Sequence, residues 1–326
     1  MTRGARWRRR VAVGAVAAAV AGCATDTVFD LPEHPTAYLA PPMPSGVATA
    51  PPPASPEPEP DCGDPTASLR PSPADATTPT PAVDRIRARG RLVVGLDTSS
   101  NLFSFRNPAT GTIEGFDVDI AREIARDLFG DPNRIEFRIL SSADRIAALD
   151  SRLVDVVVKT MSITCERRDR VAFSTVYYQA GQRVLAMRGA GIRDASDLAG
   201  RRVCAAAGTT NLHRIQQMQP DATVLTVPNW ADCLVLLQQR QVDAVTSDDA
   251  ILAGLASQDP NVELVGPAFS SEPYGIGLNK ADADLVRQVN RTLERIRTDG
   301  TWERIHDRWL SVIGPAPAPP TPHYED

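Results

Sequence analysis

The sequence predicts an α/β protein with two similar lobes and a cleft between them. From about residue 83 to residue 314, short runs rich in Val, Ile and Leu alternate with longer amphipathic stretches. This alternation is typical of strands connected by helices. In addition, the stretch "AALDSRLVDVVVKT" is echoed about 90 residues later by "VLLQQRQVDAVTSDD". Two copies are too few for a solenoid, so we assign them to the same topological position in each of two lobes.

The folded region opens with a predicted strand, helix and strand. Residues 91–97 ("RLVVGLD") and 134–140 ("RIEFRIL") predict strands, and residues 115–130 ("GFDVDIAREIARDLFG") predict a helix with apolar residues broadly on one side. Residues 153–158 are too few for a globular helix and are rich in β-branched side chains, which favours a buried strand.

Polar residues follow this last strand at its carboxyl end. They are Lys159, Thr160, Ser162, Thr164 and Arg167. In open α/β sheets, small ligands bind at the carboxyl ends of the strands, because the loops there can carry chemistry while the strands hold them in place. The sequence therefore predicts a polar ligand site at this edge of the sheet.

The first 22 residues predict an export signal. A basic segment precedes an apolar run that is too short to span a membrane. Residues 20–23, "VAGC", resemble the lipobox of bacterial lipoproteins, in which the chain is cut before the cysteine and that cysteine is lipidated. The alternative is an ordinary cleavable signal with an incidental cysteine. The resemblance implies a lipid anchor at Cys23 and a location on the extracytoplasmic face of the cell membrane.

Two segments outside the folded region are rich in proline. Sixteen of the 28 prolines fall between Leu31 and Pro81, and a segment of this composition favours an extended conformation. We therefore interpret residues 23–82 as a tether between the anchor and the folded domain. The tail at residues 315–326, "PAPAPPTPHYED", is expected to be disordered.

Charge and composition exclude several functions. The net charge is −5, and no basic block occurs beyond the signal, so nucleic-acid binding has little support. We expect no metal and no cofactor, because the histidines are scattered and no short Cys/His ligand spacing occurs. The protein is expected to be a monomer. The four histidines are His34, His213, His306 and His323.

Five ordered stretches resemble the extracellular solute-binding proteins of ATP-driven (ABC) amino-acid importers, family 3. They match the glutamate/glutamine-binding branch best and cover about residues 83–314. The stretches are "GFDVDIAREIA", "VDVVVKTMSITCERRDRVAFSTVYY", "AAAGTTNL", "VDAVTSDDAIL" and "YGIGLNKADADLVRQVNRTLERIRTDGTWERIHDRWL".

This resemblance implies a type II periplasmic-binding fold with a central ligand cleft and two hinge crossings. The first crossing would lie near residues 180–182 and the return near residues 271–274. Lobe 1 would then comprise residues 83–181 and 273–314, and lobe 2 residues 182–272.

The resemblance also implies how an amino acid is held. A zwitterion that leaves water needs both charges paired, and a guanidinium meets a carboxylate in bidentate geometry. Arg167 matches the position that grips the α-carboxylate, and Asp248 matches the position that binds the α-ammonium. Thr209 and Thr210 would present hydroxyls and N–H groups at a helix start. Each has a simpler interpretation: a surface charge for Arg167, and a helix cap for one of the threonines.

Five further residues complete the predicted site. Asp97 matches the first carboxylate of the cleft, while Lys159, together with Thr160 and Ser162, follows the buried strand. Arg106 is a candidate whose alternative is a solvated surface charge. Family members often stack an aromatic ring on the ligand near positions 100 and 142, whereas this chain has Ser100 and Ser142. A polar cleft of this kind favours glutamate, aspartate, glutamine or asparagine over apolar amino acids.

Four cysteines remain after Cys23, and an oxidising compartment allows two disulfides. Cys204 and Cys233 fall in one predicted lobe, which leaves Cys62 and Cys165 as the other pair, although four cysteines allow three pairings.

Three functions are compatible with the resemblance. The first is capture of the amino acid and delivery to the permease of an ABC importer. The second is a sensor subunit that presents its ligand-bound state to a transmembrane signalling protein. The third is a dehydratase-like enzyme on the same fold, for which Glu166 would be the free cleft acid. Binding without catalysis is the main prediction.

Overall fold

The structure is a computed structural model that describes residues 41–52, 61–71 and 79–325. The predicted signal segment at 1–22, the candidate lipidation site Cys23 and part of the proline-rich segment lie outside these residues. Within the described ranges, no helix is both long enough and apolar enough to cross a membrane.

Lobe 1 is built on a five-stranded sheet with the order β6-β2-β7-β16-β8. The strands β6 and β7 pair in parallel with β2, whereas β16 pairs antiparallel with β7 and β8. All five residues of β2 are buried, as expected for a central strand that is covered on both faces. The strands are β2 (Leu92–Leu96), β6 (Ile135–Ile139), β7 (Val156–Val157), β8 (Val171–Phe173) and β16 (Gly277–Asn279).

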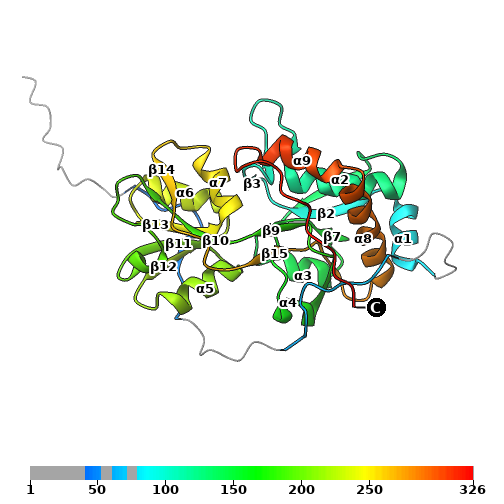
Figure 1. Cartoon of the computed structure of the whole chain (residues 1–326), viewed down its shortest axis with the longest axis horizontal. Helices are drawn as coiled ribbons and strands as arrows, with labels where there is room; N and C mark the ends of the chain where they lie inside the picture. Colours follow the sequence, from blue (N-terminus) through cyan, green and yellow to red (C-terminus); the bar gives the residue numbers. More distant parts are fainter. Residues whose placement is uncertain (1–40, 53–60, 72–78, 326) are drawn as a thin grey trace, which may run out of the picture. The chain divides into compact units, whose positions relative to one another are not determined.

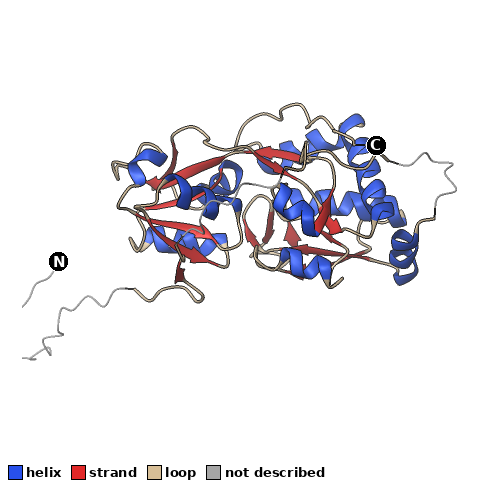
Figure 2. Cartoon of the chain, turned by 90° about the horizontal axis from the view of Figure 1, so that it is seen from below, coloured by secondary structure: helices blue, strands red, loops and turns tan. Residues whose placement is uncertain are grey.

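Helices flank the sheets (Figure 2). In lobe 1, a small sheet follows β2 in the chain. The helices are α1 (Pro81–Arg89), α2 (Phe116–Phe129), α3 (Arg145–Asp150), α4 (Cys165–Arg170), α8 (Ala283–Thr298) and α9 (Thr301–Leu310). The small sheet contains β3 (Ser99–Ser100), β4 (Ser104–Arg106) and β5 (Ile113–Glu114). Its turn leads into α2, which begins after Gly115, where φ is +136° and a Cβ would lie 2.3 Å from the Phe103 carbonyl oxygen. Glycine is therefore required at this turn.

Lobe 2 is built on a six-stranded sheet with the order β1-β12-β11-β13-β10-β14. The strands are β1 (Ala48–Thr49), β10 (Gln182–Met187), β11 (Arg202–Ala206), β12 (Thr223–Val227), β13 (Ala244–Asp248) and β14 (Val262–Val265). The helices are the 3-10 helix η1 (Ala195–Leu198), α5 (Thr210–Met218), α6 (Trp230–Gln238) and α7 (Asp249–Ala256). Two clusters of buried apolar residues lie within this lobe.

The two sheets share one topology. In each, a central strand pairs in parallel with strands on both sides, and an antiparallel strand follows. The strands β7 and β13 occupy equivalent positions, and each belongs to one copy of the repeated Val-Asp sequence pattern. The repeat therefore reflects one strand position that is used twice, and polar residues follow it in both lobes.

The chain crosses between the lobes through two short strands. β9 (Tyr178–Ala180) leads into lobe 2 and β15 (Glu272–Tyr274) returns to lobe 1. They pair antiparallel, with Glu272 opposite Ala180 and Tyr274 opposite Tyr178, and Figure 1 shows them between the two sheets. These are the segments in which the sequence placed the two hinge crossings.

The proline-rich segment differs from the predicted tether. Ala48 and Thr49 form β1, which pairs antiparallel with β12 at the edge of the lobe 2 sheet. Ala67 and Ser68 are buried against lobe 1. Proline lacks an N–H group, so such a segment cannot build a sheet or helix of its own, but its carbonyl groups can still accept hydrogen bonds from a folded domain. Composition predicts that the segment forms no structure of its own, but it does not reveal that the segment binds to the folded domain.

The predicted disorder of residues 315–326 is also wrong for the described part of the tail. Tyr324 forms a parallel bridge with Ser68 and donates to Glu294 with an O···O distance of 2.6 Å. The guanidinium of Arg70 lies 4.6 Å from the centre of the Tyr324 ring. The tail is ordered because a second extended segment, residues 61–71, lies beside it and supplies its partners.

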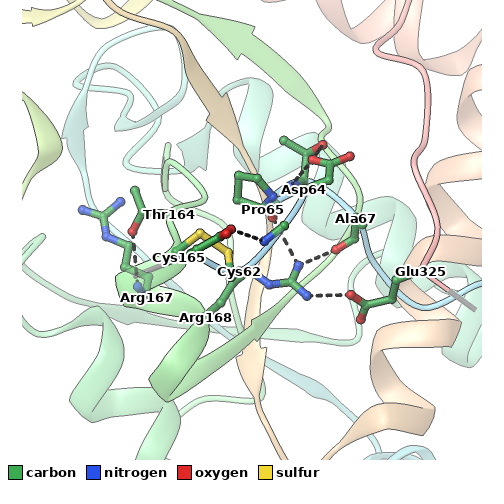
Figure 3. Close-up of a disulfide and its surroundings, with 12 residues drawn as sticks. Cys62, Asp64, Pro65, Ala67, Thr164, Cys165, Arg167, Arg168 and Glu325 are labelled. Atoms are coloured by element: carbon green, nitrogen blue, oxygen red, sulfur yellow. Dashed lines mark hydrogen bonds and ion pairs between the residues drawn. A yellow bond between two sulfur atoms is a disulfide. The ribbon is translucent and has the colours of Figure 1, made fainter. Parts of the chain in front are cut away.

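The structure contains the disulfides Cys62–Cys165 and Cys204–Cys233. The second joins β11 to α6 inside lobe 2. The first joins the proline-rich segment to α4, next to Thr164 and Arg167 (Figure 3). Of the three pairings that the sequence left open, this is the one that the structure has.

Candidate functional site

Arg167 extends from lobe 1 toward lobe 2. Helix α4 begins after Thr164, whose hydroxyl accepts the Arg167 backbone N–H with an N···O distance of 3.2 Å. The Arg167 side chain donates to the Ser162 carbonyl at 2.7 Å and to the Gly208 carbonyl of lobe 2 at 3.3 Å. Arg167 is only 8% exposed, and the partners of its guanidinium within the described chain are uncharged carbonyl oxygens. Its positive charge therefore stays available to an anion.

Lys159 and Asp97 form a buried ion pair at the carboxyl ends of β7 and β2. The Lys159 Nζ lies 2.5 Å from Asp97 Oδ2, and each residue is 2% exposed. Burial by itself would raise the pKa of Asp97, but the charge and hydrogen bond of Lys159, together with hydroxyl donors, hold this pKa below its usual value. Asp97 is therefore ionised at neutral pH, while burial lowers the pKa of Lys159 and the nearby charge of Asp97 raises it.

Ser100 and Ser142 belong to the same cluster. Ser100 donates to Asp97 at 2.9 Å, and Ser142 accepts a hydrogen bond from Lys159 at 3.2 Å. These are the two positions where family members often carry an aromatic ring. Here they hold hydroxyl groups that complete a polar network.

Arg145 is a member of the site that the sequence did not single out. It is buried at the start of α3 and donates to the carbonyl oxygens of Ser142, Lys159 and Gly208 at 2.8, 3.2 and 3.1 Å. Burial and the nearby charge of Arg167 lower the pKa of Arg145 to about 9, so it stays protonated at neutral pH. Nothing in "SADRIAALD" distinguishes Arg145 from an ordinary charged residue on a helix surface.

Asp248 is the corresponding acid of lobe 2. It ends β13 and accepts hydrogen bonds from Asn211 at 2.6 Å and from the Tyr274 hydroxyl at 2.5 Å. Burial, followed by the nearby carboxylate of Glu272, raises the pKa of Asp248 to about 7. The adjacent Asp249, the first residue of α7, accepts hydrogen bonds from the backbone N–H groups of Gly181 and Ala250.

Thr210 and Glu272 link the two lobes beside Asp248. The Thr210 hydroxyl donates to Glu272 at 2.8 Å and lies 3.5 Å from the Ser162 hydroxyl of lobe 1. Glu272 is buried in the returning hinge strand, and the sequence did not mark it as a site residue. Thr209 has a different position: its hydroxyl accepts the Leu212 N–H and donates to Ala206, so it caps α5.

Three predicted residues do not belong to the group that meets between the lobes: Thr209, which caps α5, Arg106 and Thr160. Arg106 is exposed in the β4–β5 hairpin and donates to the Gly111 carbonyl at 2.7 Å. The expectation that it lines the site is not met, because the hairpin directs the end of β4 toward solvent. Thr160 is buried beside Lys159, and its N–H group donates to Asp117 at 3.0 Å. It therefore shapes the backbone next to the site. Glu166, the candidate catalytic acid, is exposed on α4.

We call the residues that meet between the lobes the interlobe cluster. Its cationic side chains belong to lobe 1. On the opposite side, Asp248 of lobe 2 and Glu272 of the hinge supply two carboxyl groups. Among the described residues, these carboxyl groups accept hydrogen bonds only from uncharged donors. A ligand that offers a carboxylate to the first side and an ammonium to the second would neutralise both. The members are Asp97, Arg145, Lys159, Ser162, Arg167, Thr210, Asp248 and Glu272.

Direct contacts bring the lobes close together. Asn101 of lobe 1 donates to the Gly254 carbonyl and the Ser257 hydroxyl of α7 at 3.2 and 2.8 Å. A Cβ added to Gly254 would lie 2.3 Å from the Asn101 carbonyl oxygen, and one added to Gly208 would lie 2.6 Å from the Ala143 Cα. The structure therefore has the closed arrangement, in which glycines permit close approach of the two lobes.

The fold and this site agree with the comparisons to known proteins. Residues 92–312 match the family of bacterial extracellular solute-binding proteins, family 3. The chain belongs to this family. It is 38% identical over 226 residues to the ABC transporter glutamine-binding protein GlnH of Bacillus subtilis, covering 69% of this chain and 83% of that protein. It is 40% identical over 214 residues to the glutamine-binding protein of Geobacillus stearothermophilus, with 65% and 82% covered.

Solved structures show the same type II fold. The arginine-binding protein ArgBP from T. maritima, in a mutant form, matches with a TM-score of 0.67 and 31% identity over 71% of this chain and 99% of that chain. An ancestral arginine-binding protein bound to glutamine matches with a TM-score of 0.65 and 34% identity over 68% and 98%. The family and these relatives are named as binding proteins.

Proposed function

We propose that this protein captures a polar amino acid between its lobes and delivers it to the membrane subunits of an ABC importer. The observation that carries the proposal is the opposition of Arg167 on lobe 1 to Asp248 and Glu272 at the other side of the interlobe cluster. A zwitterion would join the two sides and thereby hold the lobes closed. The glutamine-binding relatives support the same ligand class.

The side chain of the ligand would meet the Lys159–Asp97 pair and its serine neighbours. This network offers an ammonium, hydroxyls and a carboxylate, which suit a short carboxylate or amide group. We therefore propose glutamate, aspartate, glutamine or asparagine as the ligand. An apolar side chain would leave these buried groups without hydrogen-bond partners from the ligand.

Three further features belong to this proposal. The protein would be held at the extracytoplasmic face of the cell membrane by a lipid on Cys23, would act as a monomer and would release its ligand unchanged. The last feature is supported by the binding-protein names of the relatives. A neighbour on the same fold is the ancestral amino acid-binding protein AncCDT-1, described as a precursor of cyclohexadienyl dehydratase, with a TM-score of 0.65 and 31% identity.

Calorimetry with the twenty amino acids tests the ligand class, and three variants test the site. Arg167→Ala and Asp248→Ala should each weaken binding of the preferred amino acid by about two to four decades, because loss of one partner leaves a buried charge unpaired at a cost of about 3–5 kcal/mol. Arg106→Ala is the matched control: its guanidinium is exposed, so its removal should change the dissociation constant by less than about threefold.

Two outcomes would contradict the proposal. Tight binding of leucine or of basic amino acids, without binding of acidic or amide ligands, would exclude the proposed ligand class. Folded Arg167→Ala and Asp248→Ala proteins that bind within about threefold of the parent, a difference well below 1 kcal/mol, would exclude the proposed site.

A further inference from the structure

Residues 47–51 are bound to lobe 2. The β1 strand pairs with β12, and the Ala50 N–H donates to the Val224 carbonyl at 2.8 Å. Gln216 of α5 donates to the Pro51 carbonyl at 2.6 Å. Val47 and Ala50 pack against the two apolar clusters of this lobe. The segment is thus held by backbone pairing, a side-chain hydrogen bond and apolar burial.

Residues 61–71 are bound to lobe 1. Cys62 is covalently joined to Cys165 of α4, and Arg168 of the same helix donates to the carbonyl groups of Pro65 and Ala67 (Figure 3). Ser68 is 2% exposed and donates to the Phe173 carbonyl at 2.7 Å. The side-chain amide of Asn290 in α8 donates to the Ser68 hydroxyl and to the Leu69 carbonyl at 2.9 and 2.7 Å.

We propose that residues 42–71 act as a strap, a third covalent connection between the lobes that limits how far they can separate. The two docked segments are successive parts of one chain, and Asp61 follows Pro52 by nine residues. A fully extended chain spans at most about 3.3–3.6 Å per residue, so the two docking points can never be more than about 30 Å apart.

The docking points lie on the elements that carry the site. On lobe 1, Cys165 is two residues before Arg167 in α4. On lobe 2, Gln216 belongs to α5, the helix that begins at Thr210. Opening of the lobes would move α4 away from α5 and so increase the distance between the two docking points. In Figure 1 the two blue segments lie against these parts of the two lobes.

The strap has a thermodynamic consequence. A longer connection would give the open state more accessible arrangements and leave the closed state unchanged, so it would lower the fraction of ligand-free protein near closure. The apparent dissociation constant rises as this fraction falls. A natural strap of limited length therefore favours binding without touching the ligand.

Two matched insertions test this proposal in the full-length protein. One places twenty Gly/Ser residues between Ser55 and Pro56, inside the connection between the lobes. The other places the same twenty residues between Ala76 and Thr77, where Pro71 and α1 on both sides belong to lobe 1. The two proteins have equal mass and composition, so a difference in their small-angle scattering comes from the position of the insert and from the separation of the lobes.

We expect the Ser55/Pro56 insertion to give a larger ligand-free radius of gyration than the Ala76/Thr77 insertion. With L-glutamine as the probe, its dissociation constant should be about threefold to tenfold larger. Equal ligand-free radii of the two proteins overturn the strap. The scattering comparison requires no ligand, so a failure of the proposed amino-acid binding would be seen separately, as the absence of a calorimetric signal in the parent protein.

Discussion

Asp248 combines deep burial with partners that carry no charge. Its carboxyl group is held by the Asn211 amide and the Tyr274 hydroxyl, while the neighbouring Glu272 repels a second negative charge. Burial and this repulsion raise its pKa to about 7. In the ligand-free protein, Asp248 is therefore about half ionised at neutral pH, although the proposed contact with an ammonium requires the ionised form.

Binding of L-glutamine should consequently weaken as the pH falls below about 7. Protonated Asp248 cannot pair with the ammonium, so the dissociation constant should rise by up to about tenfold for each pH unit below the pKa. Calorimetry between about pH 5.5 and 8 measures this, and glutamine stays essentially zwitterionic in that range. Asp248→Asn should bind weakly with an affinity that does not vary across these pH values. An equally steep profile in the Asn variant would assign the effect to another group.

The raised pKa of Asp248 makes the stability of the ligand-free protein change with pH in the opposite direction to ligand affinity. A carboxyl group whose pKa is about 7 when folded, against 3.8 in the unfolded chain, binds more protons in the folded state between these values. Its contribution to stability is therefore lost as the pH rises from about 4 to 7. Asp117, whose pKa burial raises to about 7, acts in the same direction. Ligand binding should therefore be tightest at a pH where the ionised, buried carboxyl groups contribute least to the stability of the ligand-free protein.

Helix α7 is the element whose surface lets the lobes meet. Gly254 lies inside this helix, where glycine is a poor helix former. A side chain would collide with the backbone of Asn101 in the other lobe. The glycine at this position is therefore explained by the close contact between the lobes, because helix propensity alone would favour another residue.

Gly254→Ala should separate folding from closure. Alanine favours the helix by up to about 1 kcal/mol, so the midpoint of thermal unfolding of the ligand-free protein should stay the same or rise, provided that the lobes can move apart. The added methyl group opposes closure at a cost of about 1–3 kcal/mol, so affinity for L-glutamine should fall by about fivefold or more. Thermal unfolding and calorimetry on the same sample measure the two effects. Unchanged affinity would show that the Asn101–Gly254 contact plays no part in the bound state.

At the scale of the whole molecule, docking of the proline-rich segment shortens the tether. The sequence predicts an extended connection from Cys23 to residue 82, but Val47 already packs on lobe 2. The chain from Cys23 to Val47 covers 24 residues, which would reach about 70 Å as an extended proline-rich segment. A lipid on Cys23 would therefore attach the protein through lobe 2.

Cys23→Ser should release the protein from membranes and leave amino-acid affinity unchanged, because the acyl chain requires the thiol and the folded lobes do not contact it through a tether of this length. Membrane fractionation and calorimetry of the soluble fraction measure the two properties. Mass spectrometry serves as the control for removal of the signal. A correctly processed serine variant that stays with the membrane would contradict lipid anchoring.

The sequence by itself determined the class of fold and named every member of the interlobe cluster except Arg145 and Glu272. Strand and helix periods and the repeated Val-Asp pattern are local features, so they could be recognised without the structure. The hinge segments were implied by the resemblance to the family. Lys159, Arg167 and Asp248 could be found because each follows directly on a recognisable strand or motif. The Ser100 and Ser142 substitutions were visible as well, but their joint role with Asp97 and Lys159 was not.

Only the tertiary structure decided which distant residues meet. Arg145 and Glu272 join the site because a helix start and a returning hinge strand face the same interface, whereas Arg106 is directed to solvent by a hairpin. The proline-rich segment and the tail have no apolar period, so composition predicts that neither folds by itself, and this remains true. They are ordered because β12, α4 and α8 supply partners that lie over one hundred residues away in the chain. Local sequence determines what a segment can form alone, and long-range packing determines what it binds.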